Sequence, residues 1–169
     1  MNDRIATSLH TGLLIAVLGT LTWASGLPTL FPSLGPSAFV LAMFPESEAS
    51  NPKRVIGSHV LGAVAGFLAY HLFAPGIVVT GHIPPFSLVG LRLAVSSVVA
   101  IVLTVTGMLH FGIRHPPACA TTLIVALGLL PTVSDGVVII VAVVVIVAVQ
   151  LLLLRIDEFL GDVTNTSLS

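Results

Sequence analysis

The sequence is poor in charge: Asp, Glu, Lys and Arg make up only 8% of its 169 residues, whereas they are about a quarter of an ordinary soluble domain. The net charge of −1 provides no basic surface for nucleic acid. The chain has a single cysteine, which excludes an intramolecular disulfide. These absences exclude a water-soluble globular domain and a nucleic-acid-binding protein.

The residue groups that enzymes and metal sites require are also missing. No group of His, Cys, Asp and Glu residues has the spacing of a metal site. No Ser, Thr or Cys has an evident catalytic base and a group that would orient that base. We therefore expect no catalytic residues, no metal and no cofactor, and a protein that is not an enzyme.

What the sequence does contain is long apolar runs. Hydrophobic residues make up 56% of the chain and the mean hydropathy is +1.12. A bilayer crossing needs about 20 apolar residues, and the five long runs without charge are residues 5–45, 55–91, 93–113, 115–134 and 136–154. The sequence therefore predicts a single transmembrane domain over residues 1–169, with the lipid bilayer as its surroundings.

The apolar runs and their breaks predict an all-α helical bundle. Full transmembrane helices are expected at residues 5–27, 55–74, 87–109 and 136–156. Two short helices, broken or re-entrant, are expected at residues 36–44 and 117–130. Both short segments start with proline, which suits the first position of a helix, and both follow stretches that Pro and Gly interrupt.

The two halves of the chain have the same order of long, short and long helices. This order predicts a first repeat over residues 5–74, a second over 86–156, and a polar tail over 157–169. If the short helices re-enter, there are four crossings and the Lys and Arg residues divide evenly between the two sides. If they cross, there are six crossings, and five of the six basic residues share one side, with Arg92 as the exception. This distribution favours six crossings, inverted repeats and both termini in the cytoplasm. We expect the membrane to be that of a prokaryotic cell.

The starts of the two short helices are the predicted binding site. The first amides of a helix lack partners within it, and the helix dipole favours a negative charge there. His115 is the group that could donate to an anion or take up a proton. The same pattern of proline and small residues could instead pack a re-entrant turn, and both interpretations stay open. The candidate substrate-binding residues are Gly35, Pro36, Ser37, Ala38, His115, Pro116, Pro117, Ala118, Cys119, Ala120, Thr121 and Thr122.

A second group of candidates is expected to serve helix packing or gating. Ser58, Gly62 and Gly66 follow one another at the spacing of four that lets two membrane helices approach closely. His59 lies on nearly the same face and is expected to point into the bundle or into a protomer interface. The final helix, in which Gln150 is the lone polar residue, is expected to face lipid.

Three motifs resemble the HPP family of small integral membrane proteins. The first is HPPACAT at residues 115–121, which contains the His-Pro-Pro sequence that gives the family its name. The second is NPKRVIGSH at residues 51–59, and the third is LGPSA at residues 34–38. Cys119 and Ser58 stand where the family pattern has glycine. The resemblance covers almost the whole chain.

The resemblance implies a fold and a function. The family is described as having four transmembrane helices, and some of its members are associated with nitrite transport. It therefore implies a transporter or channel for a small monovalent anion, with nitrite as the implied substrate. A chain of 169 residues makes a thin bundle, so we also expect a homo-oligomer. The alternative from another class is a membrane scaffold or sensor subunit that transports nothing.

Overall fold

The computed structural model describes residues 3–166, which are helical or in connections and contain no strand. The helices are α1 (Asp3–Ser25), α2 (Leu34–Met43), α3 (Pro52–Phe73), α4 (Leu88–Phe111), α5 (Ala118–Ala126) and α6 (Val133–Thr166). A short 3-10 turn, η1 (Glu48–Ser50), precedes α3. The order of a long, a short and a long helix occurs twice, as the sequence predicts.

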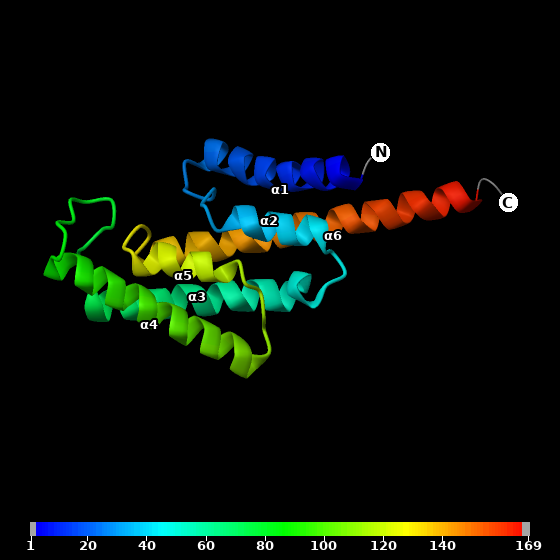
Figure 1. The fold of residues 1–169 in the computed structure, drawn as a ribbon. Coiled ribbons are helices and arrows are strands. Elements are labelled where there is room, and N and C mark those ends of the chain that lie inside the picture. The colour runs from blue at the N-terminus through cyan, green and yellow to red at the C-terminus, as the bar shows by residue number, and fades with distance from the viewer. Residues whose placement is uncertain (1–2, 167–169) are drawn as a thin grey trace.

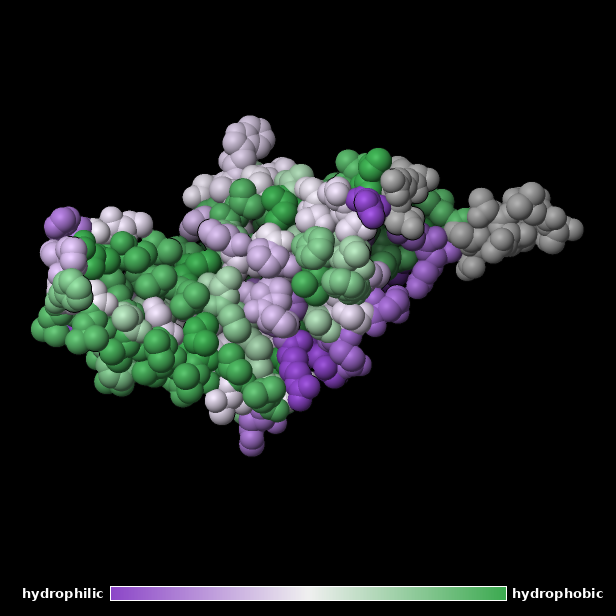
Figure 2. All heavy atoms as spheres, viewed as in Figure 1, coloured by the Kyte–Doolittle hydropathy of each residue, from purple (hydrophilic) through white to green (hydrophobic). Residues whose placement is uncertain are grey.

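The four long helices are long and apolar enough to cross a membrane. Large apolar side chains are exposed along them, including Leu72, Phe111 and Val98. Figure 2 shows hydrophobic residues over much of one face, while strongly hydrophilic residues gather along an oblique edge at the lower right. The prediction of a bundle with four full transmembrane helices and two short helices is confirmed.

The short helices differ from their predicted bounds. Pro36 is the third residue of α2, and Pro117 immediately precedes α5. Proline fits anywhere in a first turn, because the amides there have no partner within the helix, so it does not mark the first residue uniquely. At its other end, α5 stops at Ala126 because Gly128 adopts a positive φ of 75° and turns the chain. The apolar residues that follow Ala126 gave no sign of this stop.

Each helix runs opposite to the one before it (Figure 1). The connections 44–51 and 112–117 lie toward the end of the bundle where α1 begins and α6 ends. The connections after α1, α3 and α5 lie toward the other end. A backbone hydrogen bond of 3.0 Å from Val79 N–H to the Leu127 carbonyl joins two of these. Each short helix, together with its preceding coil, therefore carries the chain back along the bundle.

One face of α6 is the centre of the main apolar core. Its fully buried residues Ile139 and Val143 belong to a core cluster that also contains Leu14 of α1 and Leu34 of α2. Gln150 is 3% exposed, and its Nε2 donates to the Leu41 carbonyl at 3.0 Å. The prediction that α6 faces lipid is wrong for this face, because a uniformly apolar sequence does not distinguish a side that packs on protein from one that packs on lipid.

Candidate functional site

Five buried polar residues form one hydrogen-bonded group, which we call the central cluster: Ser33, Ser37, His59, His115 and Thr121. Each of them has 0% of its surface exposed. Ser37 Oγ lies 3.0 Å from His59 Nε2 and 3.1 Å from His115 Nε2. Thr121 Oγ1 lies 2.7 Å from His59 Nδ1 and 2.8 Å from Ser33 Oγ. The cluster therefore joins residues from both halves of the chain.

The two short helices place their first turns against each other at the central cluster. Ser33 and Ser37 are four residues apart at the start of α2, a spacing that puts both side chains on one face. Thr121 is in the first turn of α5, and His59 is in the second turn of α3. The structure thus brings together three predicted substrate-binding residues, Ser37, His115 and Thr121, and adds His59 from the predicted packing group.

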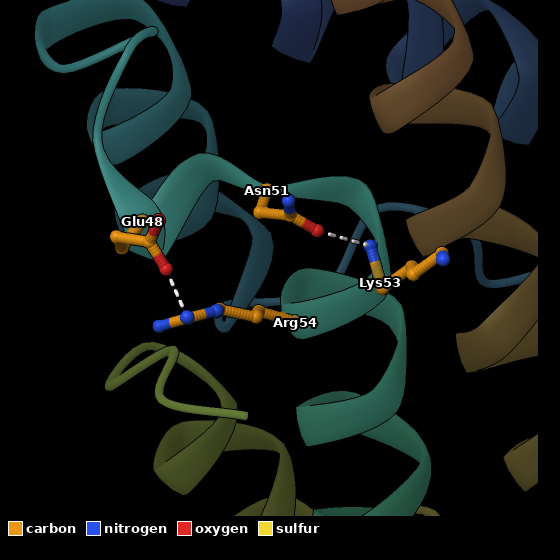
Figure 3. Close-up of polar contacts among 4 residues, drawn as sticks. All are labelled: Glu48, Asn51, Lys53 and Arg54. Atoms are coloured by element: carbon orange, nitrogen blue, oxygen red, sulfur yellow. Dashed lines mark hydrogen bonds and ion pairs between the residues drawn. The ribbon is translucent and has the colours of Figure 1, made fainter. Parts of the chain in front are cut away.

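The ring of His115 is held from its other side by backbone. Its Nδ1 lies 2.7 Å from the carbonyl oxygen of Ala49, in the 3-10 turn before α3. Figure 3 shows the polar contacts on either side of this turn: Glu48 pairs with Arg54, and Asn51 Oδ1 accepts a hydrogen bond of 3.0 Å from Lys53 N–H. These two contacts hold the stretch that carries the Ala49 carbonyl.

The stripe of small residues on α3 lies against α5. A Cβ atom added at Gly62 would lie 2.7 Å from Thr122 Oγ1 and 2.9 Å from the Ala118 carbonyl oxygen. A Cβ added at Gly66 would lie 2.7 Å from the Thr122 carbonyl oxygen. Ser58 Oγ donates to the carbonyl of Ile113, in the connection before α5. The stripe therefore lets α3 approach the short helix that carries Thr121.

The first amides of α5 already have partners. Ala118 N–H donates to the His115 carbonyl at 3.1 Å, and Cys119 N–H donates to the Pro116 carbonyl at 3.0 Å. Ala120 N–H donates to the Pro117 carbonyl at 3.0 Å. The expectation of unpaired amides is therefore not met at these three positions, because a 3-10 turn satisfies them locally. At the start of α5, the polar groups that remain for a ligand are therefore side chains.

The other predicted binding residues lie around the cluster without extending it. Thr122 turns toward α4, where its Oγ1 is 2.9 Å from Thr104 Oγ1. Within α2, Ala38 is fully buried. Ala118 is also fully buried, and Cys119 and Ala120 are half-buried. The last four residues offer no side-chain donor: Gly35, Pro36, Pro116 and Pro117.

The central cluster offers hydroxyl and imidazole groups as hydrogen-bond partners for a small polar ligand. Hydroxyl and imidazole N–H groups are donors that need no net charge. A buried imidazole without a carboxylate partner is held in its neutral form, because burial penalises charge. Within residues 3–166, no group of three or more His, Cys, Asp and Glu could hold a metal ion. Because the cluster residues hydrogen-bond one another, a ligand must replace some of these contacts.

Sequence reasoning did not identify Ser33, Thr104 or the role of His59 in the cluster. Ser33 lies in an irregular stretch where no periodicity indicates direction. Its spacing of four from Ser37, across Pro36, was the one available signal. Thr104 follows no motif, and its partner Thr122 is known only from the way α4 packs on α5.

Comparison with protein families gives one match. A family model described as "HPP, transmembrane region" matches residues 1–158, which include both short helices and all five residues of the central cluster. No curated protein and no solved structure matches the chain.

Proposed function

This chain belongs to the HPP transmembrane family, and we propose that it carries a small monovalent anion, nitrite, across the membrane. It is an integral membrane protein with four long apolar helices. The observation that carries the proposal is the central cluster, a fully buried set of hydroxyl and imidazole groups where α2, α3 and α5 meet. Fully buried polar groups in a membrane protein are candidates for the path of a polar solute.

The size and donors of the cluster support a small anion. The residues next to the donors in the two short helices are small, with Ala38 beside Ser37 and Ala118 in the first turn of α5. Two hydroxyls and two imidazoles bond to one another here, which places several donors around one point. Nitrite has two oxygen atoms and a nitrogen lone pair that accept hydrogen bonds, so it can accept from several of these donors at once.

We propose further that residues 5–74 and 86–156 are inverted repeats that move against each other. The alternating directions of the helices support this arrangement, since the first half starts at the end of the bundle where the second half finishes (Figure 1). The contacts of Ser33 with Thr121 and of Ser37 with His115 join the two halves. A rocking motion would break these contacts and open the cluster first to one side and then to the other.

We also propose an orientation in a prokaryotic cell membrane, with both termini in the cytoplasm. Arg4, Lys53, Arg54, Arg114 and Arg155 belong to the segments at the end of the bundle where α1 begins and α6 ends. Arg92 lies toward the other end, where its Nε donates to the Phe73 carbonyl at 2.8 Å. Cytoplasmic loops carry the excess of Lys and Arg.

We propose a homo-oligomer as well, because α1 packs at one edge of the bundle against α2 and α6.

The experiment that tests the transport proposal is counterflow of isotopically labelled nitrite into proteoliposomes. It is run beside chloride, nitrate and formate, with the same pH on both sides. Ala118→Leu places a larger side chain at a fully buried position beside the cluster. Ala94→Leu makes the same change at an exposed position of α4 and is the matched control.

The expected result is nitrite uptake by the unchanged protein and by Ala94→Leu, and loss of uptake in a folded Ala118→Leu protein. If the unchanged protein is folded and oligomeric but moves none of the four anions, the transport proposal fails. That outcome would favour the scaffold or sensor subunit, in which the broken segments serve packing.

A further inference from the structure

The hydrogen bonds of the central cluster have a fixed direction, because the Ala49 carbonyl can only accept. A carbonyl oxygen only accepts, so the proton of a neutral His115 ring must sit on Nδ1, 2.7 Å from Ala49 O. His115 Nε2 is then an acceptor, and the donor within reach is the hydroxyl of Ser37 at 3.1 Å. That hydroxyl also lies 3.2 Å from the Ser33 carbonyl. We assign its proton to His115, because a buried carbonyl oxygen tolerates a missing partner more often than other buried polar groups do.

The direction continues through the rest of the cluster. Because Ser37 gives its single proton to His115, its oxygen accepts from His59 Nε2–H at 3.0 Å. His59 Nδ1 is then an acceptor and receives the Thr121 hydroxyl proton at 2.7 Å. Thr121 Oγ1 in turn accepts from the Ser33 hydroxyl at 2.8 Å. The resting cluster is thus one directed chain of donors that ends at Ala49.

An anion cannot enter this chain of hydrogen bonds unless one of its groups changes its protonation state. An anion placed among the rings would accept from His59 Nε2–H and from the Ser37 hydroxyl. His115 Nε2 would then lose its donor, and its lone pair would face a negative charge. One added proton on His115 Nε2 removes both penalties, because the ring then donates to the anion through Nε2 and to Ala49 through Nδ1.

We propose that the protein carries one proton with each anion, and that His115 Nε2 is the atom that takes up this proton. This inference rests on the proposed anion transport and adds its coupling. The proton comes from water on the loading side and returns to water on the other side, and only the Nε2–H bond forms and breaks. Anion and imidazolium together carry no net charge, so the loaded site is neutral in the membrane interior.

The ionisable groups around His115 offer the protonated ring no free negative charge. The anion would therefore be its counter-charge. His59 of α3 is the ring beside it, with ring centroids 5.4 Å apart. Arg114 precedes it in the chain and is exposed, and Glu48, next to Ala49, is already paired with Arg54. Ser37 of α2 and Thr121 of α5, which complete the cluster, carry no charge. Among the hydrogen bonds and ion pairs of the described residues, no carboxylate reaches either ring.

The test is accumulation of labelled nitrite driven by a pH difference alone. Proteoliposomes are prepared with an interior one pH unit more alkaline than the outside and with the membrane potential clamped at zero. One proton per anion predicts about tenfold accumulation, since one pH unit is a tenfold proton ratio. A pH dye inside the vesicles should report one proton entering per anion. Protein-free vesicles correct for nitrous acid that crosses the lipid.

The variant that tests the assignment to His115 is His115→Gln, whose amide can bond to both neighbours but takes up no proton. Relative to its own counterflow rate, it should lose the accumulation driven by the pH difference. His82→Gln changes an exposed histidine in the connection 74–87 and should keep the tenfold accumulation. If His115→Gln still accumulates nitrite tenfold, the proton is taken up elsewhere and the assignment is overturned.

The unchanged protein decides the coupling even if the variant does not fold. Counterflow at equal pH without accumulation under a pH difference would overturn proton coupling and leave anion transport standing. Absence of counterflow for all four anions would overturn the transport proposal, and the coupling with it. Accumulation with a matching entry of protons supports both.

Discussion

At the scale of single residues, several of the candidates from the sequence lie in one chain of hydrogen bonds. Sequence reasoning could identify His115 and Ser37, since each lies beside a proline at the start of a short apolar segment. It could not find that His59 Nε2 and His115 Nε2 meet at the same hydroxyl, because that contact joins α2, α3 and the connection before α5. Contacts between distant segments leave no periodic pattern in a sequence.

The first prediction concerns the tautomers of the two buried rings. In the protein without a ligand, His115 should carry its proton on Nδ1 and His59 on Nε2, because the Ala49 carbonyl fixes the direction of the chain. Nitrogen NMR of histidine-labelled protein measures this directly, with His115→Gln and His59→Gln used for assignment. The opposite tautomer at His115 would contradict the direction on which the proton inference depends.

The second prediction concerns Ser37, which connects the two rings. Ser37→Ala removes one hydroxyl and leaves His59 Nε2–H and His115 Nε2 without their shared partner. An unsatisfied buried polar group costs about 1–3 kcal/mol, so the unfolding free energy in detergent should fall by at least this amount. Ser97→Ala is the matched control, since Ser97 Oγ bonds to the Leu93 carbonyl of its own helix and is half-buried. Equal losses in both variants would show that the central cluster adds no stability.

At the scale of helices, the repeated order of long, short and long was predictable, but the exact bounds of the short helices were not. Runs without charge located α1, α3, α4 and α6, because a bilayer crossing requires such length. The start of α2 at Leu34 and the end of α5 at Ala126 depend on local turns. The positive φ of Gly128 is one of these turns, and glycine in an apolar stretch does not by itself reveal it.

The third prediction concerns the packing of α3 on α5. Gly62→Ala places a methyl group 2.9 Å from the Ala118 carbonyl oxygen, a backbone atom that cannot turn aside. We expect a loss of about 1–3 kcal/mol in stability from overpacking and slower transport, because α5 carries Thr121. Gly19→Ala, also in a long helix but with nothing within 4 Å of the added group, is the matched control. Both are measured by thermal unfolding in detergent and by nitrite counterflow. If Gly62→Ala changes neither the stability nor the transport rate, α5 can move away from α3 without a loss of stability.

At the scale of the whole molecule, the placement of charge and the number of long apolar helices predict different paths of the chain across the membrane. Counting long helices gives four crossings. The positions of Lys and Arg favour six passes, and the alternating directions of the helices agree with the six (Figure 1). The sequence could not reveal which face of α6 is buried, because its residues are apolar on every side. Figure 2 shows hydrophilic residues gathered along one edge of the molecule.

The fourth prediction tests this path in a membrane. Single cysteines are introduced as Glu46→Cys and His82→Cys in a Cys119→Ala background, since both positions are exposed in connections toward opposite ends of the bundle. If each short helix with its coil completes a crossing, residue 46 should be labelled from the side that holds an N-terminal tag, and residue 82 from the other side. Four crossings with re-entrant short helices would reverse both results, because residue 46 would then follow a single crossing. A membrane-impermeant thiol reagent applied to intact and to inverted vesicles reads out the side. Reversal would also make the two halves parallel, which would remove the rocking motion proposed for transport and leave a static pore as the way an anion could pass.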